Sequence, residues 1–101
     1  MLIRKLSHCP EILAGDRTRL RELLHPDRDY EFSGRYSLAH AVVAPGESST
    51  PHRLKTSEAY YILAGHGEMH VDSESACVEA GDALEIKPGS TQWIRNTSTD
   101  D

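Results

Sequence analysis

The chain has 101 residues, of which 38% are hydrophobic and 27% charged, a composition typical of one globular domain. The net charge of −5 argues against a nucleic-acid partner, because binding to a phosphate backbone needs a basic surface. No run approaches the ~20 apolar residues that span a bilayer, and the charged N-terminus is unlike a signal peptide. Cys9 and Cys77 make neither a disulfide framework nor a paired metal knuckle. We therefore expect one cytoplasmic domain over residues 1–101, without nucleic-acid or membrane partners.

Two segments near the N-terminus carry the first structural signals. Residues 2–6 predict a short edge strand, in which Arg4 and Lys5 would discourage pairing with another chain. Residues 18–24 are ambiguous, because their leucine spacing slightly favours a helix. Their length between two turns is, however, ordinary for a strand.

The rest of the chain alternates short apolar runs with turn residues. Strands are predicted at residues 36–44, 56–63, 68–71, 76–79, 83–86 and 91–95. Gly65 and Gly67 predict a turn that joins two of these strands, residues 56–63 and 68–71, as a hairpin. Eight short strands at close spacing, counting residues 2–6 and 18–24, predict an all-β barrel or sandwich.

Two stretches that begin with glycine carry the strongest motif signal. Residues 46–65 read GESSTPHRLKTSEAYYILAG, with His52 six residues before Glu58, and residues 81–96 read GDALEIKPGSTQWIRN. Together they resemble the two motifs of the cupin superfamily. The first cupin motif contains a glycine, His-x-His, a glutamate and a glycine; the second contains a glycine, Pro-x-Gly, a histidine and an asparagine. The resemblance extends over about residues 37–96, the motif-bearing core.

The spacing of the motif residues matches the cupin motifs, but some of the residue types at these positions differ. The matching positions are Gly46, His52, Glu58, Gly65, Gly81, Gly89 and Asn96. Leu54 takes the place of the second histidine, Gln92 replaces the histidine of the second motif, and Lys87 stands where proline is usual. The chain is similar to stand-alone cupins grouped with mannose-6-phosphate isomerase. The resemblance implies a small double-stranded β-helix, a cupin or jelly-roll-like barrel, and favours a strand for residues 18–24.

Strand alternation predicts which side chains point into such a barrel. If Glu58 and Gln92 point inward, so do Tyr60, Ile62, Ile94 and Asn96. With Leu54, this set would form a largely apolar pocket with a few polar groups at one end. That is the usual make-up of a small-molecule site.

In cupins, the histidines and the glutamate of the two motifs hold a divalent metal. The resemblance therefore implies metal ligation by His52 and Glu58, with Gln92 offering an amide oxygen and Leu54 nothing. His40, on the strand before the first motif, is a further candidate ligand, although the pattern around it does not say which face points inward. Nitrogen and oxygen ligands suit iron(II), manganese, nickel, copper or zinc without choosing among them.

A plainer interpretation makes His52 and Glu58 solvated residues of a decayed metal site. Against it, an ionised carboxylate inside a barrel is costly unless something compensates its charge. A metal, a protonated His52, or an Arg53 or Lys55 side chain that points inward would compensate the charge. The remaining histidines of the motif region have simpler roles, since His66 is predicted at a hairpin tip and His70 on the solvent face.

Two functional hypotheses follow. The first is a small metal-binding cupin that acts as an isomerase- or dioxygenase-type enzyme on a small oxygenated molecule, with Tyr60 as a candidate acid. The alternative is a non-catalytic module that binds a small ligand, or a structural dimer with a vestigial pocket and an outer Trp93–Tyr61 patch. A cupin-like barrel usually has one more strand after Asn96. Either that strand is lost, or the N-terminal strand or a partner chain covers the open edge, so we expect a homodimer.

Overall fold

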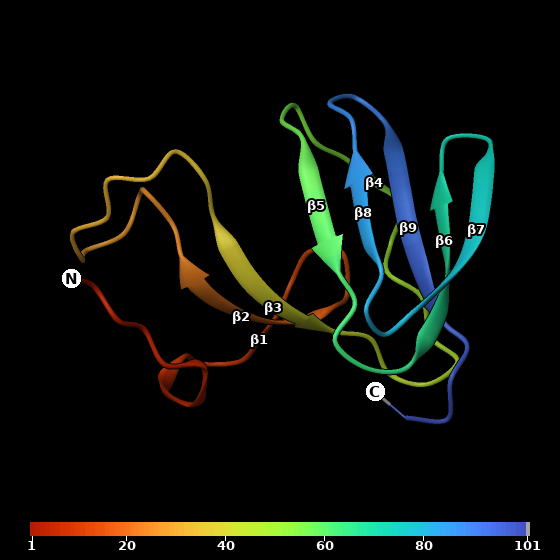
Figure 1. Cartoon of the computed structure of the whole chain (residues 1–101), viewed down its shortest axis with the longest axis horizontal. Helices are drawn as coiled ribbons and strands as arrows, with labels where there is room; N and C mark the ends of the chain where they lie inside the picture. The colour runs from red at the N-terminus through yellow and green to blue at the C-terminus, as the bar shows by residue number, and fades with distance from the viewer. Residues whose placement is uncertain (101) are drawn as a thin grey trace. The chain divides into compact units, whose positions relative to one another are not determined.

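The computed structural model describes residues 1–100, whose regular elements are strands apart from one 3-10 turn, Leu6–His8 (Figure 1). The all-β class predicted from the sequence is therefore confirmed. No helix in this part of the chain is long and apolar enough to cross a membrane. The chain divides into two compact units, and the expectation of one domain over residues 1–101 stays a prediction.

The first unit comprises Met1–Ala14 and Thr18–Val42. It contains an antiparallel sheet in the order β1-β2-β3, with β1 at Ile12–Leu13, β2 at Arg19–Leu24 and β3 at Leu38–Val42. The strand interpretation of residues 18–24 is confirmed, because β2 pairs with a neighbour on each side. Pairing across the sheet outweighs the weak helical spacing of the leucines.

The predicted edge strand at residues 2–6 is wrong. Side-chain contacts hold this segment, since the Arg4 guanidinium lies over the Tyr30 ring, 4.2 Å from its centroid, and Arg4 Nε donates to the Leu23 carbonyl at 3.0 Å. The backbone then enters the 3-10 turn at Leu6, closed by a bond from the Cys9 N–H to the Leu6 carbonyl.

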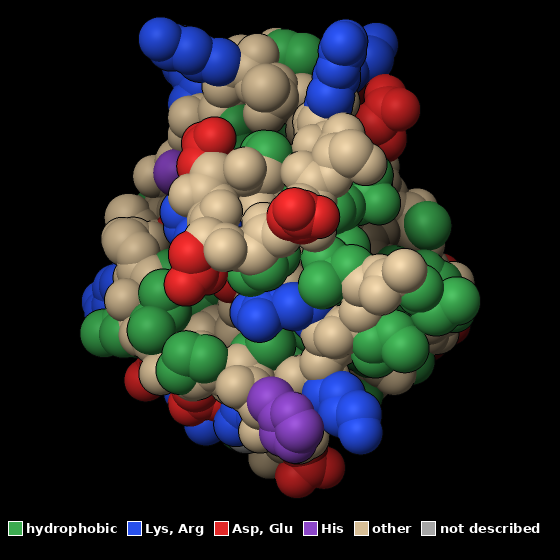
Figure 2. Space-filling view, turned by 90° about the vertical axis from the view of Figure 1, so that its left-hand side faces the viewer, with side chains coloured by type: hydrophobic (Ala, Val, Ile, Leu, Met, Phe, Trp, Pro, Cys, Tyr) green, Lys and Arg blue, Asp and Glu red, His purple; other side chains and the backbone are tan. Residues whose placement is uncertain are grey.

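Several large apolar side chains of the first unit are exposed. Those on the sheet are Ile12, Leu13 and Leu38, with exposed fractions of 54%, 74% and 51%. Figure 2 shows hydrophobic side chains, in green, lying open between charged ones on one face of the molecule. Exposure of this kind agrees with a binding surface, and the expected homodimer stays a prediction.

The second unit comprises Gly15–Arg17 and the chain from Val43 onward. One of its sheets has the order β4-β9-β6-β7, and the other pairs β5 with β8. The strands are β4 at His52–Arg53, β5 at Glu58–Tyr61, β6 at His66–Val71, β7 at Glu74–Glu79, β8 at Ala83–Ile86 and β9 at Thr91–Asn96. The predicted strands over residues 36–44, 56–63, 68–71, 76–79, 83–86 and 91–95 are thus confirmed within a few residues.

The predicted hairpin between residues 56–63 and 68–71 is wrong. The turn around Gly65 carries the chain from one sheet to the other, so that β5 pairs with β8 while β6 pairs with β7 and β9. The hairpin in this region is β6–β7, whose turn contains Asp72 at a φ of 52°. A positive φ is readily adopted by Asp and Asn, which explains the turn there.

The core of the second unit lies on the inner faces of both sheets. Met69, Val78 and Ile86 are buried, and five partly buried side chains pack against them: Tyr60, Ile62, Val71, Leu84 and Ile94. The alternation predicted along β5 is confirmed, because Glu58 and Tyr60 are half-buried whereas the residues between and after them are exposed. β5 and β9 therefore present alternate side chains to the interior.

Backbone hydrogen bonds bring the two motif stretches together. The Gly46 N–H donates to the Asn96 carbonyl at 2.9 Å, and the Gly89 N–H donates to the Leu54 carbonyl at 2.8 Å. Both glycines have a positive φ, 75° and 83°, which glycine adopts without steric strain. The turns at these two glycines thus place the beginning of the first motif beside the end of the second, and the middle of the second motif beside the middle of the first.

Candidate functional site

The centre of the candidate site is the amide of Gln92, a β9 side chain only 1% exposed. Its Oε1 accepts a hydrogen bond from the Tyr60 hydroxyl at 2.7 Å, and its Nε2 donates to Glu58 Oε2 at 2.6 Å. A buried amide joined at both ends fixes the rotamers of its partners. Gln92 thus links the two polar side chains of β5 into one chain of hydrogen bonds.

The same chain of hydrogen bonds explains how the negative charge of the Glu58 carboxylate is compensated. The Gln92 amide donates to it, and a hydrogen bond to an ionised acceptor is stronger than a neutral one. Arg53, one of the compensating groups expected from the sequence, instead donates to Thr91 Oγ1 at 3.0 Å. The hydrogen bond from Gln92 therefore stabilises a carboxylate on the inner face of β5.

His52 reaches the same site from β4. It is the register partner of Gln92, and side chains directly opposite in an antiparallel pair lie on the same face. Its Nδ1 lies 3.1 Å from the Thr50 carbonyl and 3.9 Å from Asp16 Oδ2. A carbonyl only accepts, so this contact assigns the proton to Nδ1 and leaves the Nε2 lone pair available.

Tyr60 remains a neutral hydrogen-bond donor in the site. Burial raises the pKa of its hydroxyl above the ordinary value of 10.0, and the negative charges of Glu58 and Asp16 raise it further. At neutral pH the hydroxyl keeps its proton and donates it to Gln92. As the candidate acid predicted from the sequence, Tyr60 would therefore act from its neutral form.

The raised pKa of Tyr60 predicts a loss of stability in alkaline solution. The folded state keeps this proton to a higher pH than the unfolded state, so the stabilisation is complete below pH 10 and is lost as the pH rises above it. Above about pH 10, the free energy of unfolding should fall by up to about 1.4 kcal/mol per pH unit more steeply in the wild type than in Tyr60→Phe. Urea titrations of both proteins between about pH 8 and 11.5 measure this difference. If the free energy of unfolding depends on pH in the same way in both proteins, the prediction is contradicted.

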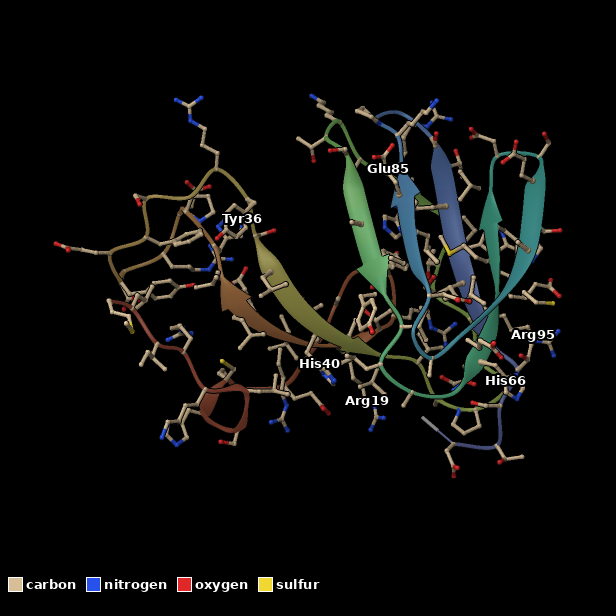
Figure 3. All side chains as sticks on the ribbon, in the orientation of Figure 1. Arg19, Tyr36, His40, His66, Glu85 and Arg95 are labelled. Carbon is tan, nitrogen blue, oxygen red and sulfur yellow. The ribbon has the colours of Figure 1, made fainter. Side chains whose placement is uncertain are left out.

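The other residues predicted for the site are placed differently. Leu54 is 38% exposed, so its predicted place in an inward apolar pocket is wrong. It follows the end of β4, where its backbone bonds to Gly89. His40 lies on β3 in the first unit, with Arg21 as its register partner, and its role as a ligand stays a prediction (Figure 3).

The donor set fits a divalent metal only as an open site. His52 Nε2 and a Glu58 oxygen are suitable donors, whereas Gln92 Oε1 already accepts the Tyr60 hydroxyl. Within residues 1–100, no group of three or more His, Cys, Asp or Glu side chains is placed to hold a metal. Water or a small molecule would have to supply the remaining ligands.

Two predictions about the outer face of the second unit are corrected. His70, predicted to face solvent, is half-buried and stacks on Trp93 with ring centroids 3.7 Å apart. Tyr61 is exposed on β5 whereas Trp93 lies on β9, in the other sheet, so they do not form the predicted patch. The cross-strand pairing of His70 with Trp93 explains the stack.

His66 begins β6, and its Nδ1 lies 2.9 Å from Thr97 Oγ1. It borders an open hollow of about 440 Å³, lined also by Gly67, Cys77, Val78, Glu79, Asp82 and Thr97. The residues of the hollow do not include the four members of the candidate site.

Asp16 was not identified from the sequence as a neighbour of the site. Gly15–Arg17 belongs to the second unit, and the Asp16 carbonyl accepts the Thr50 N–H at 2.7 Å. Asp16 lies far outside both motifs, and a Gly-Asp turn gives no sign of its spatial neighbours. Only the folded arrangement brings it near His52.

Comparisons with known proteins agree with this fold. The uncharacterized protein MJ1618 of Methanocaldococcus jannaschii is 41% identical over 86 residues, which cover 83% of this chain and 66% of that protein. The chain thus spans slightly less than two thirds of that relative.

Solved structures are similar along nearly the whole chain. The crystal structure of a Cupin 2 conserved barrel domain protein from Salinispora arenicola CNS-205 has a TM-score of 0.81 at 27% identity, covering 99% of this chain and 81% of that one. The structure of a predicted oxalate decarboxylase from Thermotoga maritima has a TM-score of 0.79 at 21% identity, and the match covers 98% of this chain and 90% of that one. At this level of identity the similarity shows the fold alone. The predicted cupin barrel is therefore confirmed. Because the cupin domain family matches residues 39–101, more than half of the chain, the protein belongs to the cupin family.

Proposed function

We propose that this cupin binds a small, oxygen-bearing molecule at the site formed by His52, Glu58, Tyr60 and Gln92. The observation that carries the proposal is the hydrogen-bonded chain Glu58–Gln92–Tyr60, to which β4 adds His52 on the same face. A few polar groups beside an apolar core are typical of small-molecule sites.

The hydrogen-bonding character of the site suggests the class of ligand. Glu58 has two oxygens with about four lone-pair sites, more than the Gln92 amide uses, and His52 offers a lone pair on Nε2. The site is therefore rich in acceptors. It suits a ligand that donates hydrogen bonds from hydroxyl groups, such as a sugar, an enediol or a phenol.

A divalent transition metal is the second candidate ligand. The supporting observation is the contact of His52 Nδ1 with the Thr50 carbonyl, since ligating histidines commonly donate their other N–H to a carbonyl or carboxylate. His52 and Glu58 would hold the metal. A bound metal would stabilise negative charge developing on ligand oxygens, the chemistry of an isomerase- or dioxygenase-type cupin. Tyr60 and Gln92 would then orient the ligand.

Metal content and ligand-induced stabilisation of the purified protein test both candidates. Inductively coupled plasma mass spectrometry measures the metal, and thermal unfolding with sugar, enediol and phenol panels measures ligand binding. A ligand at 100 times its Kd should stabilise the wild type by about 2.7 kcal/mol. We expect this stabilisation to be lost in His52→Ala and Glu58→Gln, and any bound metal to be lost with it.

His66→Ala and Glu85→Gln are matched controls, because neither residue belongs to the site and both are exposed. They should retain the binding of the wild type. Stabilisation that persists in both site variants, or a wild type that holds neither metal nor any ligand of the panels, would contradict the proposal. Turnover of a bound ligand would distinguish an enzyme from a binding module.

A further inference from the structure

Asp16 is positioned beside the candidate site by backbone contacts of its own. Its carbonyl accepts the Thr50 N–H at 2.7 Å, and Arg17 after it has a φ of 72°, in the left-handed region. Non-glycine residues in that region are uncommon and mark a constrained turn. The loop thus holds Asp16 against the segment that leads into β4.

The same segment fixes the His52 ring. The Thr50 N–H donates to the Asp16 carbonyl, and the Thr50 carbonyl accepts a hydrogen bond from His52 Nδ1–H at 3.1 Å. The Asp16 carboxylate lies 3.9 Å from the same ring nitrogen. That separation is too long for a hydrogen bond, so the carboxylate acts on the ring through its charge.

We propose that Asp16 is a positioning residue for His52. It anchors Thr50 through the backbone and favours the proton on Nδ1 through its charge, so that Nε2 presents its lone pair to the ligand. Partners of this kind, which contact a binding histidine on its far nitrogen, set both its tautomer and its orientation. The inference rests on the proposed function for its consequence in binding.

The test measures the tautomer of His52 by nitrogen-15 NMR of the histidine-labelled protein, at a pH where the imidazole is neutral. The wild type should show the proton on Nδ1. Asp16→Asn should shift the population toward the Nε2–H tautomer, and Asp16→Glu should restore it. Glu85→Gln, which removes an exposed carboxylate from β8, should leave the tautomer unchanged.

Binding provides the second readout, using zinc and the same sugar and phenol panels. Affinity should fall by about tenfold in Asp16→Asn, the lower end of the range for such partners, because the Thr50 carbonyl remains. If Asn disrupts folding, Asp16→Ser provides the same removal of charge. An unchanged His52 tautomer in a folded variant without the charge overturns the inference, whether or not a ligand binds. A shifted tautomer in a protein that binds none of the probes upholds the inference and contradicts the proposed function.

Discussion

Replacing Gln92 by alanine is expected to lower the free energy of unfolding by about 4 kcal/mol. Two effects add: truncating a fully buried side chain leaves a cavity, which costs about 2 to 5 kcal/mol for aliphatic side chains of similar size. The Glu58 carboxylate and the Tyr60 hydroxyl also lose their shared partner, and an unsatisfied buried group costs about 1 to 3 kcal/mol. Partial exposure of Glu58 and Tyr60 lets water recover some of this loss.

Equilibrium urea unfolding of Gln92→Ala and Gln92→Met separates the two effects. Methionine fills nearly the same volume but has no amide, so it removes the hydrogen bonds and leaves little cavity. We expect Gln92→Met to lose less stability than Gln92→Ala and still to lose ligand binding. A loss below about 1 kcal/mol for Gln92→Ala would contradict the buried, doubly bonded amide.

Most strands could be predicted from the sequence, because a short apolar run and the turn residues on either side of it are neighbours in the chain. Ala83–Ile86 lies between turn residues on both sides, and its predicted limits agree with β8. β4 was missed because His52–Arg53 is only two residues long, too short for any alternation to appear. Its pairing with β9 comes from a segment about forty residues away, and no local pattern encodes that partner.

Local sequence patterns could not predict which strands pair with one another in each sheet. A Gly-x-Gly turn between two strand-like runs predicts a hairpin, yet β5 pairs with β8 through Glu58 and Ile86. The choice is made by burial: Ile86 and Tyr60 both contribute to the core of the second unit, and pairing β5 with β8 places them there together. Long-range packing overrode the local turn signal.

Some features of the candidate site could be predicted from the sequence, and others depend on the folded structure. His52, Glu58 and Gln92 were predicted from the resemblance to the cupin motifs, and the structure brings Glu58 and Gln92 into contact and places His52 opposite Gln92. Their chemistry was harder to foresee, because spacing does not reveal that the Gln92 amide serves both Glu58 and Tyr60. Asp16 had no signal at all. Metal ligation by these residues, and by His40, stays a prediction.

Replacing Gly67 by alanine is expected to destabilise the protein by about 3 kcal/mol, the upper end of the usual range for inserting a methyl group into a packed site. Gly67 lies on β6 between Asn96 of β9 and Val78 of β7. A Cβ at this position would lie 2.6 Å from the Arg95 carbonyl oxygen, a backbone atom that cannot rotate away. Relief of the overlap requires β9 to move, and β9 carries Gln92. Loss of ligand binding should therefore accompany the loss of stability.

Gly15→Ala is the matched control, because a Cβ at Gly15 would meet no atom within 4 Å. Its free energy of unfolding should stay within about 0.5 kcal/mol of the wild type. Urea unfolding of both variants measures the comparison, and thermal unfolding with the ligand panels shows whether binding follows stability. If Gly67→Ala is as stable as Gly15→Ala, β9 can move away from β6 without loss. Close packing of the β6 backbone against β9 would then not be what holds Gln92 between Glu58 and Tyr60.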